Sequence, residues 1–456
     1  MRKLIEFQIL DTNAVHYGLD ISDLMDNAGR GIADYILSNF DLEHSISVVC
    51  GTGNNGGDGY VASNILIKEG YDVRIFSVSR PDAGILKKKY ELVLDNTRSI
   101  EELFDLKDKT DIVIDCLLGS GIKGNPRPPY DKCINFINDF DNIISVDVPS
   151  GFGTNNSVIP DVTITFHDYK MGMNEDNSGI IVLHDVGFPK DIDEKTGPGE
   201  LLLYPDFDPE KHKGQNGKVA IIGGGPYSGA PALSALGSYR AGTDLVHVFV
   251  PESSFEQVST FAPELLVHKL SGEIVSKMNI DLLFEQEFDS IVIGPGMGKD
   301  PTSLEAVQTV IDNCDNIVID ADGISKYDFQ NKNVILTPHK GELSRLGLRS
   351  NQTDLFEFSS KNNVTILLKG KTDVITDGHF VKKNSTGHPR MAVGGSGDVL
   401  AGVCGGLMAK GLTPFESSRL AAYSIGLAGE HCYNNVGPGF LPTDLAVSLS
   451  MVLKRS

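Results

Sequence analysis

The chain has 456 residues and a formal net charge of −21, from 40 Lys and Arg against 61 Asp and Glu. This length fits about two or three domains. With 40% hydrophobic and 22% charged residues, the composition is that of a folded protein rather than a disordered one. So acidic a surface argues against nucleic acid or an anionic membrane as a partner, because both are bound through Lys and Arg. The 49 glycines are informative where they cluster.

The cysteines and the N-terminus bear on the cellular compartment. Six cysteines are spread along the chain without a CxxC pair, which favours neither a disulfide framework nor a zinc site. The first residues, MRKLIEFQILDTN, lack the long apolar core of a signal peptide. No run of about 18 apolar residues that could span a membrane occurs. We therefore expect a soluble, cytoplasmic protein.

The first half of the chain alternates between predicted strands and helices. The expected elements are a helix at 20–38, a strand at 45–50, a helix near 60–69 and strands at 72–78, 111–118, 142–149 and 162–166. Short apolar runs separated by helices indicate a parallel sheet that is covered on both faces. The fold class is therefore α/β.

A change in composition at 185–217 separates the two halves, because this segment is rich in Pro, Gly and charge. The strands expected after it lie at 245–250, 290–296, 316–321, 333–338 and 364–370, followed by a hairpin with a DG turn and a helical end at 397–454. We find no internal repeat between the halves. Two α/β domains, 1–205 and 206–456, are the predicted organisation.

The most prominent local motif is GTGNNGGDG at 51–59, between a predicted strand and a helix. Glycine lets a backbone approach a ligand closely, and the amides at a helix N-terminus favour an anion. A tight turn is the alternative, but it would not need the two asparagines and the aspartate. A Rossmann dinucleotide site is disfavoured, because the second strand ends at Arg80 without the expected acidic residue.

Further polar residues follow the predicted strands of the first half. Asp115 and Asp147 end two strands, and Ser150 follows closely. Because the carboxyl ends of parallel strands face one crevice, these side chains could converge with Asn55 and Asp58. Their oxygens suit a hard cation, and an aspartate could act as a general acid or base. For any one aspartate alone, capping of a turn is the simpler interpretation.

At this point the motifs carry a resemblance. The segments LMDNAG (24–29), GTGNNGGDG (51–59), DCLLGSGIKG (115–124) and DVPSG (147–151) resemble the N-terminal epimerase domain of bifunctional NAD(P)H-hydrate repair enzymes. The resemblance implies a Rossmann-like, three-layer α/β/α domain that interconverts the R and S hydrates of NADH and NADPH. The segment FHDYK (166–170) departs from the small-residue form of that family.

The resemblance also implies roles for individual residues of the first half. The implied substrate-binding residues are Asn54, Asn55, Gly56, Gly57, Asp58, Gly119, Ser120, Gly121, Ile122, Lys123, Gly124, Asn125 and Asp147. The implied potassium ligands are Asn55, Asp115 and Ser150. Asp147 is the candidate catalytic acid or base, and Lys170 matches a lysine of the family.

In the second half, Gly394 to Gly397 precede a predicted helix that carries Asp398 in its first turn. Backbone amides there could bind an anion, and the carboxylate could take a proton from a substrate hydroxyl. Phosphoryl transfer needs this combination. The alternative is an acidic residue that only favours the helix dipole. No GxxxxGK[ST] motif occurs, so a P-loop is not supported.

Other polar residues of the second half have competing interpretations. His339 could cap a helix or bind a ligand. Lys369 and Lys371 flank a glycine after a strand and could meet phosphates, although an isolated pair is more often solvated. Asp320 and Asp322 could support a network of magnesium-bound water or only a turn.

The string HPRMAVGGSGDVLAGV (388–403), with TPHKGE, IGPGMG and the SGAP helix entry, is similar to the ribokinase-like dehydratase domain of the same bifunctional family. The RAGTDLV segment (240–246) departs from the family's form. The resemblance implies contacts to the hydrate from Ala230, Gly296, His339 and Asp398. It implies contacts to the adenine nucleotide from Lys369, Gly370, Lys371, Thr372, Asp373 and Gly397.

Together the two resemblances predict a repair enzyme for the NADH and NADPH hydrates (NADHX and NADPHX), acting as a homo-oligomer. They imply K⁺ at the epimerase site and Mg²⁺ with ADP at the dehydratase site, and they leave ADP against ATP open. Two rival hypotheses remain. The GGSGD motif by itself is also compatible with a small-molecule kinase of vitamin metabolism. Alternatively, the first domain could be only a binding or scaffold module.

Overall fold

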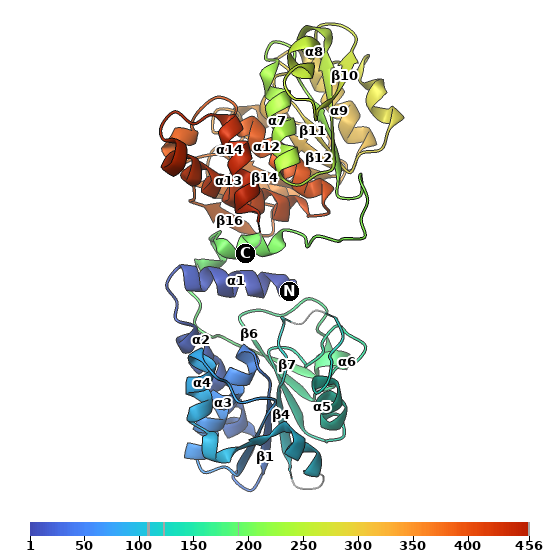
Figure 1. The fold of residues 1–456 in the computed structure, drawn as a ribbon. Helices are drawn as coiled ribbons and strands as arrows, with labels where there is room; N and C mark the ends of the chain where they lie inside the picture. Colours follow the sequence, from blue (N-terminus) through green and yellow to red (C-terminus); the bar gives the residue numbers. More distant parts are fainter. Residues whose placement is uncertain (107–109, 122–123, 190, 455–456) are drawn as a thin grey trace. The chain divides into compact units, whose positions relative to one another are not determined.

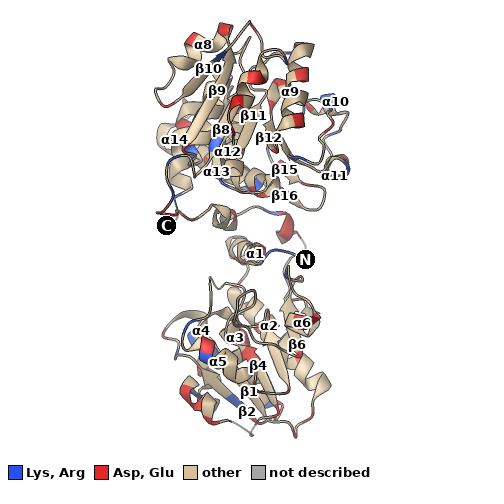
Figure 2. Cartoon of the chain, turned by 90° about the vertical axis from the view of Figure 1, so that its right-hand side faces the viewer, with Lys and Arg blue, Asp and Glu red and all other residues tan. Residues whose placement is uncertain are grey.

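The computed structural model describes residues 1–106, 110–121, 124–189 and 191–454. It divides into two compact units, Met1–Ile192 and Asp193–Ser456 (Figure 1). Residues 193–205, which the sequence analysis placed in the first domain, pack with the second unit. The buried Glu200 pairs there with Arg419, with 3.2 Å between Oε2 and Nε. Charged residues of both signs are spread over the helices and loops of both units (Figure 2).

The first unit is built on a seven-stranded parallel sheet of order β3-β2-β1-β4-β5-β6-β7. Its elements are α1 (Leu4–His16), α2 (Ile21–Asn39), β1 (Ile46–Cys50), α3 (Asn54–Lys68), β2 (Val73–Ser77), α4 (Gly84–Glu91), β3 (Thr97–Ser99), β4 (Ile112–Cys116), α5 (Tyr130–Ile137), β5 (Ile143–Val146), β6 (Val162–Phe166), α6 (Glu175–Ser178) and β7 (Ile180–His184). The predicted parallel α/β class is confirmed.

Helices cover both faces of this sheet, because successive side chains of a strand point to opposite faces. In β1, Val48 packs with Ile32 of α2 and Leu66 of α3, whereas Val49 packs with Ile134 of α5. The central strands are buried on both sides, which explains their uninterrupted apolar sequences. Helix α1 was not foreseen by the sequence analysis.

The second unit contains a nine-stranded sheet of order β10-β9-β8-β11-β12-β13-β14-β15-β16. All its pairs are parallel except β14–β15 and β15–β16. Its elements are β8 (Lys218–Ile222), α7 (Gly229–Arg240), β9 (Leu245–Pro251), α8 (Glu252–Ser259), β10 (Leu266–Leu270), β11 (Ser290–Ile293), α9 (Pro301–Asn313), β12 (Asn316–Ile319), β13 (Asn333–Leu336), α10 (Leu343–Leu346), α11 (Gln352–Asn362), β14 (Val364–Leu368), β15 (Asp373–Thr376), β16 (Val381–Asn384), α12 (Ser396–Ala409), α13 (Pro414–Val436) and α14 (Pro442–Val452). The predicted DG hairpin is confirmed as β15–β16.

This sheet is also packed on both faces. Ile221 of β8 joins a core with Ala235 of α7 and Val403 of α12, whereas Ile222 joins one with Val307 of α9. The strands end toward the starts of their following helices, so polar residues after β8, β11, β12, β13 and β14 gather at one edge. Among the described residues, no helix is both long and apolar enough to cross a bilayer.

Candidate active sites

The glycine-rich segment after β1 brings the start of α3 against the neighbouring strand end. A Cβ on Gly51 would lie 1.8 Å from the carbonyl oxygen of Leu117, so only glycine permits this approach. The tight-turn interpretation is therefore correct for Gly51. It does not account for Asn55 and Asp58, whose side chains are buried in the first turns of α3 and line a cavity.

Asp115 is the penultimate residue of β4 and is completely buried. Its Oδ1 accepts hydrogen bonds from Ser150 Oγ at 2.6 Å and the amide of Leu117 at 3.2 Å. Its Oδ2 accepts from Ser145 Oγ at 2.8 Å and the amide of Ser150 at 2.9 Å. Burial raises the pKa of Asp115, and these hydrogen bonds oppose the rise. The structure thus joins two of the three implied potassium ligands directly.

The third implied ligand, Asn55, donates from Nδ2 to the carbonyl of Val146 at 3.0 Å. The residues suit a monovalent cation, because within the described ranges no ion pair balances the buried carboxylate of Asp115. Its four hydrogen-bond donors are all neutral. In the same described ranges, no group of three or more His, Cys, Asp or Glu residues could hold a metal ion. An oxygen-only set with one carboxylate is the chemistry of a hard, weakly charged ion.

Asp147, directly after β5, has the left-handed backbone conformation at φ 65°. Its Oδ1 lies 2.5 Å from Nζ of the fully buried Lys170. The same ammonium donates to Thr165 Oγ1 at 2.7 Å and to the carbonyl of Phe166 at 3.0 Å. A non-glycine residue in this conformation is unfavourable and marks sites where side-chain direction matters. The lysine fixes that direction.

These residues meet in a cavity of about 710 Å³ at the carboxyl ends of the strands. It is lined by seven of the residues that the sequence analysis assigned to the substrate site, namely Asn54, Asn55, Asp58, Gly119, Ser120, Gly121 and Asp147. Burial, helped by Asp147 and Asp11, raises the pKa of Asp58 well above its usual range. Asp11 of α1 also lines the cavity and was missed, although Phe7, Leu10 and Ala14 have helical spacing and are buried.

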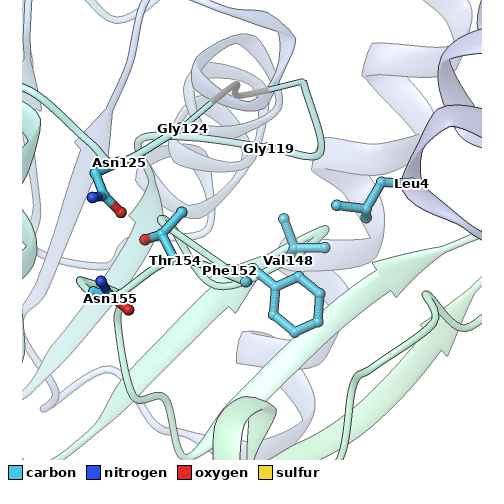
Figure 3. A pocket seen from close by; sticks show the side chains of 9 residues that line it. Leu4, Gly119, Gly124, Asn125, Val148, Phe152, Thr154 and Asn155 are labelled. Carbon is cyan, nitrogen blue, oxygen red and sulfur yellow. The ribbon is translucent and has the colours of Figure 1, made fainter. Parts of the chain in front are cut away.

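A second cavity of about 350 Å³ adjoins the segment 119–125, which the resemblance assigns to substrate binding (Figure 3). Gly119, Gly124 and Asn125 line it, while Ile122 and Lys123 lie outside the described residues. In the figure the polar side chains of Asn125, Thr154 and Asn155 group at one end of the cavity. The apolar side chains of Phe152, Val148 and Leu4 group at the other end. Gly119 borders both cavities, which therefore flank this segment.

In the second unit, Gly395 has φ 101° and caps α12, so that Asp398 stands in the first helical turn. A Cβ on Gly397 would lie 3.2 Å from Nζ of Lys369, which places this ammonium against the helix start. Lys369 donates to Oδ1 of the buried Asp320 at 2.8 Å. Burial raises the pKa of Asp398 to about 7, with Asp320 adding to the rise and Lys369 opposing it.

The other predicted hydrate-binding residues lie at neighbouring strand ends. Gly296, with φ 71° after β11, lies beside Ala230 in the first turn of α7. His339 follows β13 and pairs with Glu342, with 3.4 Å between Nε2 and Oε1. A β-bridge joins His339 to Lys369, so the backbones of these two residues lie side by side.

The predicted nucleotide segment, Lys369 to Asp373, forms the connection from β14 to β15. Asp373 accepts from the amide of Gly370 at 3.0 Å and from Asn384 Nδ2 at 3.1 Å, which holds the turn closed. Burial raises the pKa of Asp373. Lys371 and Thr372 are accessible. At the beginning of this turn, the ammonium of Lys369 lies beside the start of α12.

Comparisons with known proteins bear on both units. A family model described as NAD(P)H-hydrate dehydratase matches residues 219–450, and one described as YjeF-related protein N-terminus matches residues 21–172. The bifunctional NAD(P)H-hydrate repair enzyme Nnr of Archaeoglobus fulgidus is 36% identical over 460 residues, covering 99% of this chain and 98% of the relative. The enzyme of that name from Methanothermobacter thermautotrophicus is 33% identical, covering 99% and 95%.

Solved structures resemble one part of the chain. An ADP/ATP-dependent NAD(P)H-hydrate dehydratase from Bacillus subtilis, co-crystallised with ATP and Mg²⁺, has a TM-score of 0.50 at 25% identity over 56% of this chain and 95% of its own. A ribokinase-like protein from Enterococcus faecalis has a TM-score of 0.51 at 25% identity over 57% and 95%. The predicted ribokinase-like fold is confirmed. With relatives matched from end to end, the chain belongs to the family of bifunctional NAD(P)H-hydrate repair enzymes.

Proposed function

We propose that this chain repairs hydrated NADH and NADPH in two steps. The unit Met1–Ile192 interconverts the R and S hydrates, and the unit Asp193–Ser456 dehydrates the S form with ADP, giving NAD(P)H, AMP and phosphate. The observation that carries the proposal is an aspartate near a lysine at the strand ends of each unit, in a chain matched over 99% of its length by a bifunctional repair enzyme. The boundary between the two activities is proposed at 192/193 rather than 205/206.

In the second unit, Asp398 is the proposed base of phosphoryl transfer. It takes the proton of the substrate hydroxyl as the oxygen attacks the terminal phosphorus of ADP and AMP leaves. The amides around Gly397 and the ammonium of Lys369 stabilise the charge that develops on the phosphoryl oxygens. The phosphate then leaves with the C–O electron pair while the neighbouring ring carbon loses a proton, which restores the double bond.

The charge around Asp398 fits a divalent cation, because Asp320 and Asp322 add negative charge there, which Lys369 offsets in part. Arg345 pairs with Asp322 at 3.7 Å. Asp320 and Asp322 would hold Mg²⁺ through water. When bound with the nucleotide, Mg²⁺ neutralises phosphate charge. The nucleotide contacts are proposed for Gly397 and the Lys369–Asp373 turn, and the hydrate contacts for Ala230, Gly296 and His339.

In the first unit, the hydrate is proposed to occupy the 710 Å³ cavity, with contacts from Asn54–Asp58 and the Gly119–Asn125 loop. Asp147 is the proposed acid–base group, and Lys170 positions it. Asn55, Asp115 and Ser150 would hold K⁺ at the strand ends, where the cation would balance the buried carboxylate. A homo-oligomer and a cytoplasmic location remain predictions.

Racemic NADPH hydrate provides the test, with ADP and ATP in parallel reactions. The full chain with ADP should consume both epimers faster than spontaneous epimerisation permits. An Asp398→Asn variant should lose ADP-dependent dehydration while still interconverting the epimers. An Asp147→Asn variant should consume the S form alone. Full dehydration by a folded Asp398→Asn variant would contradict the proposed role of Asp398. Consumption of only the S form by the unaltered chain would contradict the epimerase activity proposed for the first unit.

A further inference from the structure

Helix α1 belongs to the wall of the first cavity. Its N-terminal side is held by Arg2, whose Nε donates to Oδ2 of Asp168 at 2.9 Å. Further along, Gln8 Nε2 donates to the carbonyl of Ser120, one of the proposed substrate-binding residues, at 3.1 Å. Phe7, Gln8, Asp11, Thr12 and Val15 line the cavity. The helix therefore stands over the carboxyl ends of the strands in a fixed position.

Asp11 brings a third carboxylate into this cavity, beside Asp58 and Asp147. The ammonium of Lys170 is already bonded to Asp147. Asp58 is 8% exposed, and in the described part of the chain its carboxylate has no hydrogen-bond or ion-pair partner. A buried carboxyl group without a partner is costly, so it indicates a ligand that completes the site.

Asp11 lies in the cavity wall with part of its surface still accessible, so a molecule in the cavity can reach it. Enclosure by the protein and repulsion from Asp147 raise the pKa of Asp11 to about 7, while Lys170 and His167 oppose the rise. Asp58 also repels Asp11. Near neutral pH a substantial fraction of Asp11 therefore carries a proton. The carboxylate of Asp147, in contrast, has the ammonium of Lys170 2.5 Å away.

We propose that Asp11 is a second catalytic residue of the epimerase site, which delivers a proton to the substrate from α1 while Asp147 accepts one at the strand end. The proposal rests on the epimerase function proposed above. It assigns opposite roles to two carboxylates that line the same cavity.

The chemistry of the hydrate explains the need for both groups. Water adds to a dihydronicotinamide so that the hydroxyl lies on the carbon beside the ring nitrogen. Protonated Asp11 gives its proton to this hydroxyl, the C–O bond breaks and the nitrogen lone pair forms a C=N⁺ bond. Water then attacks the opposite face of that carbon, returns the electron pair to nitrogen and gives its proton to Asp147. A proton passing from Asp147 to Asp11 restores the starting state.

The test uses the full chain and substitutes Asp11→Asn and Asp11→Glu, with Asp34→Asn on the exposed side of α2 as the matched control. Epimerisation is followed on isolated (R)-NADPH hydrate, and dehydration on isolated (S)-NADPH hydrate with ADP. We expect Asp11→Asn to lower kcat for epimerisation by about 10²-fold or more and to leave dehydration unchanged. Asp11→Glu should recover part of the rate, and Asp34→Asn should match the unaltered chain.

The outcomes separate this proposal from the proposed function. If the unaltered chain does not epimerise the hydrate, the function itself fails. If it does and Asp11→Asn epimerises within about threefold of it, Asp11 is not the acid and the proposal is overturned. Equal loss in both Asp11 variants, together with a lowered unfolding temperature of the first unit, would assign Asp11 a structural role and also overturn it.

Discussion

Each unit has an aspartate at the carboxyl ends of its parallel strands, but the nearest lysine is bonded differently in the two units. In the first unit, Asp147 has a buried ammonium 2.5 Å away, so its carboxylate is paired. In the second unit the corresponding ammonium, on Lys369, bonds Asp320 instead, and Asp398 is left with a pKa raised to about 7. In the first unit the ammonium contacts Asp147 itself, whereas in the second it bonds a neighbouring aspartate and only partly offsets the rise in the pKa of Asp398.

The largest expected effect comes from removing the cation of the first pair. Lys170→Met would leave Asp147 without its partner and remove the donor to Thr165 and Phe166. Breaking a buried pair from one side costs about 3 kcal/mol. We expect the first unit to lose about that much unfolding free energy and epimerisation to fall by about 10²-fold or more, while dehydration of the S hydrate continues.

Chemical denaturation, with the unfolding transition of each unit measured separately, checks the change in stability. Separate assays of epimerisation and dehydration check the change in activity. Lys68→Met, at the end of α3 in an exposed position, is the matched control. Unchanged epimerisation in Lys170→Met would mean that Asp147 needs no fixed partner. The different bonding of the lysines in the two units would then have no effect on activity.

The pH dependence of the two reactions should have opposite directions. Asp398 must be ionised to act as a base, so dehydration should slow as the pH falls below its pKa of about 7. Asp11 must be protonated to act as an acid, so epimerisation should slow as the pH rises above its pKa of about 7. Each limb should approach a tenfold change per pH unit.

Initial rates on the isolated R and S hydrates between pH 5.5 and 8.5, roughly 1.5 units on each side of the two pKa values, give these profiles. The alkaline limb of epimerisation should disappear in Asp11→Asn, whose residual rate comes from groups that do not titrate there. Two limbs of the same direction would show that one of the acid and base roles is reversed.

The sequence could predict these sites where a local pattern carries the information. Asp115 and Asp147 lie at the ends of short apolar runs, and Asp398 follows a glycine cluster before a helix, so strand and helix boundaries were enough to make them candidates. Asp11 could not be found this way, because its place depends on α1 folding back over strand ends more than a hundred residues away. The partner of Lys369, 49 positions earlier, is equally a product of tertiary packing.

A smaller effect is expected at the predicted cation site. Ser150→Ala would remove the donor to Asp115 at 2.6 Å and the acceptor for the amide of Leu118 at 2.8 Å. Leaving these buried groups unsatisfied costs about 1–3 kcal/mol. We expect a lower unfolding free energy of the first unit and a higher KCl concentration for half-maximal epimerisation, with dehydration unaffected. An unchanged KCl requirement would argue against Ser150 as a ligand of K⁺.

The smallest effect is expected at the start of α12. In Gly397→Ala the new methyl group would lie 3.2 Å from Nζ of Lys369, closer than an ordinary contact. Because that ammonium ends a flexible side chain, it can move by a few tenths of an ångström while keeping its bond to Asp320. We expect KM for ADP to rise by about three- to tenfold with little change in kcat, since a displaced cation weakens phosphate binding more than it alters Asp398. A loss in kcat as large as that of Asp398→Asn would instead mean that the glycine itself approaches the transferred phosphate, as backbone amides at helix starts can do.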